Sequence, residues 1–169
     1  VGRRRPRTKL TPIIWGGGQE KSLRPGTLNT PLIVGLGAAM TLAKKQVVAT
    51  ARHVTACNRL LLETINGAVD GLQINGHPTD RLPNNLAVSI AGIEPLALMR
   101  LLREKVAFSA SSACATETVE TSHVVLAMFG ATPRARSAFR LSPGRHTSLA
   151  EIAEAAGEIA QGVARLRQM

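Results

Sequence analysis

The stretch of sequence that decides the fold covers residues 31–65 and reads PLIVGLGAAMTLAKKQVVATARHVTACNRLLLETI. Its apolar residues recur at roughly the 3.6-residue period of an α-helix. The recurring residues are Leu32, Leu36, Met40, Ala43, Val47, Ala51, Val54, Leu61 and Ile65. The pattern predicts one long helix, and Asn66-Gly67 is expected to end it.

Shorter elements are expected on both sides of this helix. Upstream, residues 10–15 form an apolar run suited to a strand, which Gly16-Gly17-Gly18 breaks. Downstream, the pattern predicts strands at 71–74, 86–90, 106–108 and 138–141, and helices at 94–102 and 122–129. Ser148-x-x-Glu151 is a capping box that opens an amphipathic final helix. Alternating strands and helices predict an α/β or α+β layer structure.

Composition and charge limit the class of protein. The 169 residues are 44% hydrophobic and 19% charged, an ordinary balance for a folded chain with one core. The net charge is +10, and five basic residues lie among the first ten, an arm that could bind phosphate backbones. No aromatic residue is interleaved with these arginines and no zinc-finger spacing occurs, so nucleic-acid binding is the least favoured function.

The cysteine content and the N-terminal residues indicate the compartment. Cys57 and Cys114 are too few for a disulfide framework and fit a reducing cytoplasm. The first residues lack the apolar core of a signal peptide, and the apolar run 28–43 is shorter than the ~20 residues of a membrane helix. We therefore expect a cytoplasmic chain without a membrane segment. It has no initiator Met, as is expected of a fragment.

The two cysteines have different surroundings. Cys114 lies in the small-residue segment Ser-Ala-Ser-Ser-Ala-Cys-Ala-Thr, residues 109–116, which leaves a thiol room to react but does not exclude a structural role. Cys57 lies between Val54 and Leu60 on the long helix and is expected in the core.

Two arginines are candidate anion-binding residues. In segment 16–27 a glycine-rich bend is combined with Arg24 and Thr27, which could surround a phosphate, although a simple turn explains the same residues. Arg140 is flanked by apolar residues on an expected strand. If buried it requires an anionic partner, and on the solvent side of the strand it requires none. The four histidines show no metal-ligand spacing.

Four motifs follow one another in an order that is typical of one enzyme family. They are Gly-Gly-Gly-Gln-Glu at 16–20 with Arg24-x-Gly26-Thr27, then Leu82-Pro83-Asn84, then Ser111-Ser112-Ala113-Cys114, and finally Arg140-Leu141-Ser142-x-Gly144-Arg145. Over essentially its whole length the chain resembles the C-terminal portion of cysteine desulfurases of the iron–sulfur cluster assembly type, within the class V aminotransferases. The resemblance implies a pyridoxal-phosphate transferase of fold type I. Residues 1–45 would form the end of its large domain and the start of a connecting helix, and residues 46–169 its small domain with the cysteine loop.

The resemblance also implies a role for each candidate residue. Cys114 would attack the sulfur of the substrate L-cysteine, leaving a persulfide and releasing alanine. Arg140 would hold the substrate carboxylate. Thr27 would reach the cofactor phosphate of the neighbouring subunit, with Arg24 supporting its loop, which implies a homodimer. The sulfur would pass to an acceptor or scaffold protein.

Departures from the family pattern also carry information. Lys21-Ser22 stands where the family commonly has Arg-Gly, and Pro25 where Ser is usual. The Schiff-base lysine of the family precedes the region matched here, so a complete site would need a chain that supplies the N-terminal half. Apolar surface is therefore expected to lie uncovered. The rival interpretation is a non-enzymatic module that accepts sulfur or binds a protein.

Overall fold

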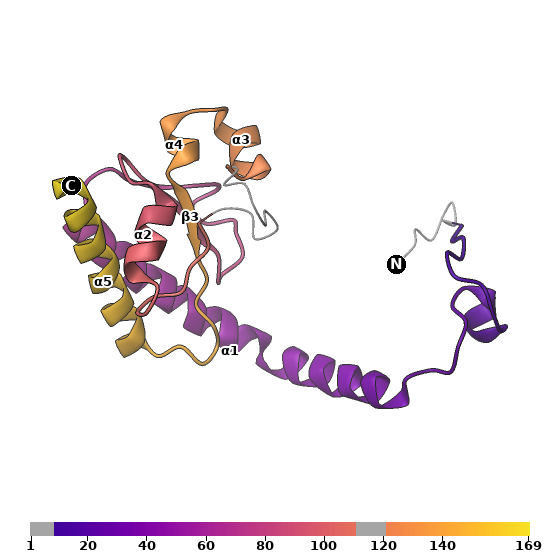
Figure 1. Ribbon diagram of the computed structural model, residues 1–169. Coiled ribbons are helices and arrows are strands. Elements are labelled where there is room, and N and C mark those ends of the chain that lie inside the picture. The colour runs from indigo at the N-terminus through magenta and orange to yellow at the C-terminus, as the bar shows by residue number, and fades with distance from the viewer. Residues whose placement is uncertain (1–8, 111–120) are drawn as a thin grey trace. The chain divides into compact units, whose positions relative to one another are not determined.

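The computed structural model describes residues 9–110 and 121–169. The chain forms two compact units, Val1–Lys45 and Gln46–Met169. The long helix α1 (Thr30–Ala68) begins in the first unit and ends in the second (Figure 1). The predicted helix is thus confirmed, although it continues through Asn66-Gly67 to Ala68.

The first unit has little regular structure before α1. Between residues 9 and 29 the one short element is the 3₁₀ turn η1 (Gln19–Ser22), in which no residue is buried. The prediction of a strand at 10–15 is wrong, since these residues form no strand. A strand needs a hydrogen-bonded neighbour, and the apolar run provides only the side chains for one.

The N-terminal part of α1 presents apolar side chains to solvent. Leu32 is 69% exposed and Met40 is 65% exposed, so the expectation of uncovered apolar surface is confirmed. An 18-residue window of α1 has a mean hydropathy of 1.4 and no buried residue, which makes the helix long and apolar enough to cross a membrane. The apolar run 28–43 by itself is shorter than this window, so the sequence pattern did not indicate a helix of this length and hydropathy. Core helices of soluble proteins meet the same criterion, so length and composition do not distinguish the two.

The second unit is built on a three-stranded antiparallel sheet in the order β1-β2-β3. The strands are β1 (Leu72–Ile74), β2 (Leu86–Ile90) and β3 (Ala138–Leu141). The central strand is β2. Its Ile90 pairs with Leu72 of β1, and its Leu86 pairs with Leu141 of β3. These three strands agree with the predicted ones. A fourth prediction, a strand at 106–108, is wrong, because pairing in this region is limited to one isolated bridge between Ser109 and Arg140.

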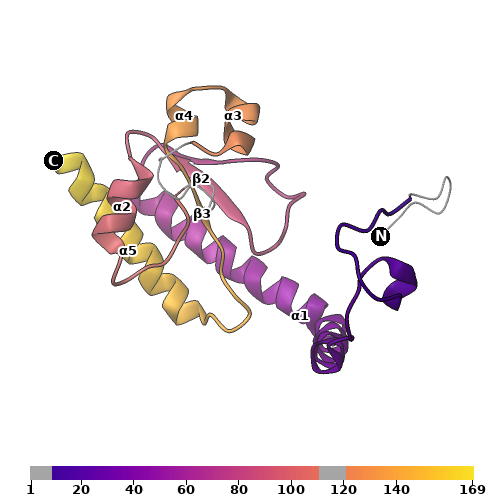
Figure 2. The ribbon, with the colours of Figure 1, turned by 45° about the vertical axis from the view of Figure 1, so that its right-hand side comes forward.

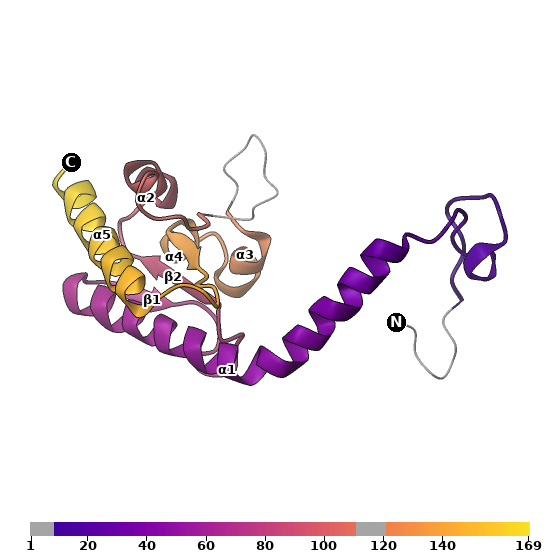
Figure 3. The same ribbon diagram turned by 90° about the horizontal axis from the view of Figure 1, so that it is seen from below.

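One face of the sheet carries the core. The C-terminal part of α1, α2 (Pro95–Leu102) and α5 (Leu149–Gln168) supply most of the residues that pack on it (Figure 3). Alternating residues of β2 and β3 complete the cluster, as expected for a half-covered sheet. The cluster consists chiefly of Cys57, Leu61, Ile65, Leu86, Val88, Ile90, Leu98, Leu102, Phe139, Leu141, Ile152, Ala156, Ile159 and Val163.

The helix ends agree with their local sequence signals. Glu94 caps α2, since its carboxylate accepts hydrogen bonds from the backbone N–H groups of Leu96 and Ala97. Ser148 and Glu151 form the predicted capping box of α5. Together with the antiparallel sheet, these helices confirm the α+β form of the expected fold.

On the other side of the sheet lie α3 (His123–Phe129) and α4 (Pro133–Arg136), which leave part of that face exposed (Figure 2). α3 was predicted from the sequence, whereas α4 was not. Here Ser89, which is 1% exposed, accepts a hydrogen bond from Asn75 and donates one to the carbonyl of Arg134, both at 2.8 Å. The Arg134 guanidinium bonds the Asn75 side chain at 3.1 Å and lies 4.0 Å from the ring centroid of Phe129. A small polar network therefore holds this layer in place.

Candidate functional site

Arg140 is held next to the start of the segment that carries Cys114. The backbone N–H of Arg140 donates to the carbonyl of Ser109 at 2.8 Å, and the N–H of Ser109 donates back to Arg140 at 3.1 Å. The guanidinium Nη2 also reaches the Ser109 hydroxyl at 3.4 Å. Arg140 and Ser109 are 31 positions apart in the sequence, so only the fold brings them together.

The side chain of Arg140 lies on the solvent side of β3. Its neighbours Phe139 and Leu141 are 3% and 4% exposed, whereas Arg140 is exposed. Of the two readings that the sequence left open, the solvent-facing one is therefore correct. Within residues 9–110 and 121–169 no carboxylate forms an ion pair with Arg140. Its guanidinium is thus available to a carboxylate ligand, which it can bind through two parallel hydrogen bonds.

Cys114 itself lies outside the described residues, as do Ser111, Ser112 and Ala113. The structure describes the residues that precede this segment. Ser109 is half-buried and Phe108 stacks in a tilted geometry on Phe139, with ring centroids 5.3 Å apart. This contact anchors the entry to the cysteine segment on β3. The sequence analysis did not identify Ser109. The available signal was its position as a polar residue directly after the apolar residues 106–108.

The glycine-rich segment of the first unit brings together Arg24 and Thr27. The Arg24 Nη1 atom donates to the carbonyl oxygens of Gly26 at 3.0 Å and of Thr27 at 3.1 Å. Gly26 has a φ of +91°, in the region that favours glycine. Within the described residues the Thr27 hydroxyl forms no hydrogen bond and Arg24 no ion pair. An exposed hydroxyl beside an arginine without a carboxylate partner fits an anionic group such as a phosphate.

Three successive residues of this segment have left-handed backbone. Glu20, Lys21 and Ser22 have φ values of 51°, 58° and 62°, and none of them is glycine. Left-handed backbone costs a residue with a Cβ about 1–2 kcal/mol. Glycine adopts such backbone without this cost, so Ser22 adds strain at a position that suits glycine.

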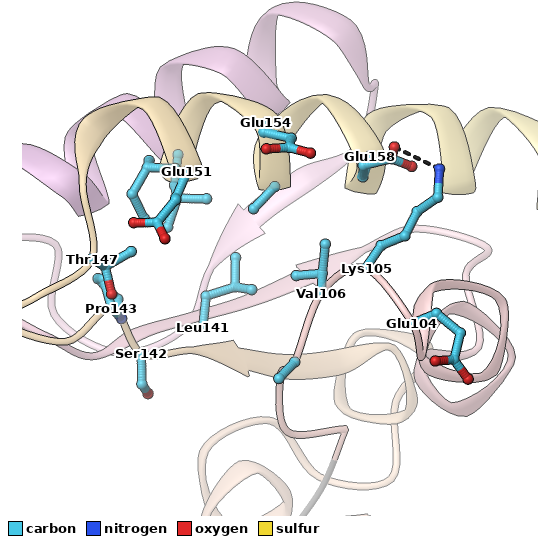
Figure 4. A pocket seen from close by; sticks show the side chains of 14 residues that line it. Glu104, Lys105, Val106, Leu141, Ser142, Pro143, Thr147, Glu151, Glu154 and Glu158 are labelled. Carbon is cyan, nitrogen blue, oxygen red and sulfur yellow. Dashed lines mark hydrogen bonds and ion pairs between the residues drawn. The ribbon is translucent and has the colours of Figure 1, made fainter.

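A cavity of the second unit lies between α5, the turn after α2 and the end of β3 (Figure 4). It has a volume of about 570 Å³ and an apolar floor that includes Val106 and Leu141. Four carboxylates line it, those of Glu104, Glu151, Glu154 and Glu158. The Lys105 ammonium pairs with Glu158 at 2.6 Å. Because Leu141 faces this cavity and side chains alternate along a strand, Arg140 points away from it, so the cavity is separate from the arginine site.

Cys57 is a buried structural cysteine, as predicted. It is 0% exposed, and burial raises the pKa of its thiol, an effect that a backbone hydrogen bond partly offsets. Its Sγ lies 3.6 Å from Nε2 of His53, which is 2.8 Å from the carbonyl oxygen of Thr147. A neutral, buried thiol is a poor nucleophile. These contacts link α1 to the turn before α5.

The fold agrees with what comparison with known proteins finds. Residues 2–154 match the model of the family described as aminotransferase class-V. The chain therefore belongs to the aminotransferase class-V family.

Several relatives of the chain are described as cysteine desulfurases. The chain is 38% identical to cysteine desulfurase IscS of Anaeromyxobacter sp. and 35% identical to that of Rickettsia bellii, over 99% of its own length. It spans only 41% and 40% of those two proteins. A solved structure described as a NIFS-like protein superimposes with a TM-score of 0.80 at 29% identity, covering 95% of this chain and 41% of that one.

Proposed function

We propose that this chain forms the C-terminal part of a pyridoxal-phosphate-dependent cysteine desulfurase that transfers sulfur from L-cysteine through Cys114. The observation that carries the proposal is the pairing of Arg140 with Ser109, five positions before Cys114 in the sequence. It joins a carboxylate-binding cation to the segment with the nucleophile. The identity of 35–38% to cysteine desulfurases over 99% of the chain supports the same assignment.

In this proposal Arg140 and Cys114 act on two ends of one substrate. The exposed guanidinium of Arg140 binds the α-carboxylate of L-cysteine and orients the substrate. The Cys114 thiolate attacks the substrate sulfur and the bond between that sulfur and the substrate β-carbon breaks. The electron pair of the broken bond stays with the carbon skeleton, which is protonated and leaves as alanine, while Cys114 keeps the sulfur as a persulfide. The persulfide is then available to an acceptor protein, for iron–sulfur cluster assembly or another sulfur transfer.

Thr27 and Arg24 would serve the cofactor. The Thr27 hydroxyl would donate to the phosphate of pyridoxal phosphate in the neighbouring subunit, and Arg24 would keep Thr27 in place by its two hydrogen bonds to the carbonyls of Gly26 and Thr27. When bound, the cofactor withdraws electrons from the substrate carbon skeleton. The lysine that attaches the cofactor would come from the N-terminal half, in the same protein or in a partner chain. Lys44, Lys45 and Lys105 are not assigned this role.

The proposed assembly is a cytoplasmic homodimer. The exposed apolar residues of α1, among them Leu32 and Met40, support a partner surface rather than a free one. In this proposal the N-terminal half of the enzyme and the second subunit cover them. Residues 1–45 then belong to the large domain and residues 46–169 to the small domain.

The deciding experiment measures sulfur transfer by mass. The chain is incubated with pyridoxal phosphate and L-cysteine, alone and together with a polypeptide that supplies the N-terminal half, and a 32-Da adduct is sought by intact mass, one sulfur atom being about 32 Da. Cys114→Ala should abolish the adduct, whereas the control Cys57→Ala should leave it. Arg140→Gln should raise the KM for L-cysteine, since the carboxylate loses its partner.

Each outcome has a defined meaning. A Cys114-dependent adduct that forms only with the partner polypeptide supports a desulfurase assembled from two parts. An adduct that persists in Cys114→Ala contradicts the assignment of the nucleophile. No cofactor absorbance and no adduct in either mixture would favour the non-enzymatic module instead.

A further inference from the structure

The turn that presents Thr27 is held together by polar contacts rather than by a core. None of the residues Gln19–Ser22 is buried, and Gly26 and Thr27 are exposed. Three hydrogen bonds between side chain and backbone close the turn. Two come from Arg24, and the third runs from the backbone N–H of Gly26 to the side-chain Oε1 of Gln19 at 3.1 Å. The conformation around Thr27 therefore depends on these two side chains.

Gln19 and Arg24 hold opposite sides of the same short stretch of backbone. Gln19 accepts from the N–H of Gly26, and Arg24 donates to the carbonyls of Gly26 and Thr27. Arg24 thus fixes the two peptide groups that flank Thr27, and Gln19 fixes the preceding one, between Pro25 and Gly26, so the two side chains together set the direction of the Thr27 Cα–Cβ bond. Gln19 and Gly26 are seven positions apart, so this hydrogen bond joins the glycine-rich start of the segment to the part that carries Thr27.

The glycines of the segment leave room for this contact. A Cβ at Gly17 would lie 2.5 Å from Oε1 of Gln19, and a Cβ at Gly16 would lie 2.8 Å from Cβ of Pro25. Any other residue at these positions would displace the groups that close the turn. The close approach of Gly16 to Pro25 and of Gly17 to the Gln19 side chain therefore explains these two glycines without direct contact with a ligand.

From this geometry we infer that Gln19 is a positioning residue, which orients the Thr27 hydroxyl toward the phosphate of the cofactor through the N–H of Gly26. The inference rests on the proposed function, because it needs Thr27 to bind the phosphate. A glutamine suits the task better than a glutamate. Both offer an acceptor oxygen, but a carboxylate would place a negative charge beside a phosphate site.

The test compares Gln19→Ala and Gln19→Glu with the control Glu20→Gln, since within the described residues the Glu20 side chain forms no hydrogen bond or ion pair. The first readout is backbone amide hydrogen exchange at Gly26. Gln19→Ala should exchange about threefold to tenfold faster, the factor for one net hydrogen bond. Gln19→Glu retains the acceptor and should exchange at the wild-type rate.

The second readout is cofactor affinity in the assembly with the polypeptide that supplies the lysine. Absorbance titrations use pyridoxal phosphate and pyridoxal, which lacks the phosphate. Both Gln19 variants should bind pyridoxal phosphate about threefold to tenfold more weakly, while pyridoxal affinity stays within about twofold. A general structural defect would weaken both compounds equally.

The variant Thr27→Ala distinguishes a failure of the positioning role of Gln19 from a failure of the proposed phosphate contact of Thr27. If Thr27→Ala weakens pyridoxal phosphate binding and Gln19→Ala does not, the positioning role of Gln19 is overturned and the proposed function stands. If Thr27→Ala leaves the affinity unchanged, the assignment of Thr27 to the phosphate fails, and the role of Gln19 fails with it. Unchanged exchange at Gly26 in Gln19→Ala also overturns the inference.

Discussion

The two units of the chain are stabilised in opposite ways. The second unit, Gln46–Met169, buries an aliphatic cluster between a sheet and three helices. The first unit, Val1–Lys45, has no buried residue in its described part and relies on hydrogen bonds from Arg24 and Gln19. Hydrophobic burial is the main stabilising contribution in a folded domain. The comparison indicates that the second unit can stabilise itself, whereas the first is expected to depend on a partner surface.

The largest effect should come from a cavity in the core of the second unit. Leu98 on α2 is 0% exposed, so Leu98→Ala should lower the free energy of unfolding by about 2–5 kcal/mol. The matched control in the first unit is Leu32→Ala, which removes a 69% exposed side chain and should change stability by under about 0.5 kcal/mol. Urea denaturation measures both. A comparable loss of stability from Leu32→Ala would mean that Leu32 is covered in solution, and would contradict the difference proposed between the two units.

A smaller effect is expected from the polar network on the other face of the sheet. Ser89→Ala leaves the Asn75 amide without its acceptor and removes one of the two hydroxyl donors to the Arg134 carbonyl, the other being Ser137 at 3.2 Å, at a cost of about 1–3 kcal/mol. Ser142, an exposed residue directly after β3, provides the control variant Ser142→Ala. If both variants unfold at the same urea concentration, the network contributes nothing beyond the apolar core.

In the first unit, relief of backbone strain should be detectable at Ser22. Its φ of 62° favours glycine, so Ser22→Gly should stabilise the turn by about 1 kcal/mol. Slower amide exchange at Gly26 would report this gain. The control Ser22→Ala keeps the Cβ and should show none. Faster exchange in Ser22→Gly would indicate that flexibility of the unfolded turn outweighs the strain.

The smallest effect concerns the pH dependence of the second unit. Hydrogen bonds from the backbone N–H and hydroxyl of Ser148 hold the pKa of Glu151 below its ordinary value of 4.5. A lowered carboxyl pKa stabilises the folded state above the ordinary value, and this contribution is lost as pH falls through the lowered pKa. Glu151→Gln should therefore flatten the stability profile below pH 4.5, measured by urea denaturation from pH 7 to pH 3. Glu154→Gln is the control, and an equal flattening there would show that the cap is not the cause.

Local patterns predicted a large part of this fold. The apolar period of α1, the Glu94-Pro95 start of α2 and the Ser148–Glu151 capping box each lie within a few residues along the chain, so the sequence alone reveals them. The wrong strands at 10–15 and 106–108 share one cause. A strand exists only with a hydrogen-bonded neighbour, and neighbours are chosen by the tertiary structure.

The same division applies to the candidate site. Sequence by itself determined which residue types are present, Cys114 among small residues and Arg140 on a strand, and the family to which they point. Only the tertiary structure decided that Arg140 faces solvent beside Ser109, and that Gln19 holds the N–H of Gly26. The physical reason is that residue types and short-range periodicity are written along the chain, whereas hydrogen bonds between distant positions form only after the backbone has folded.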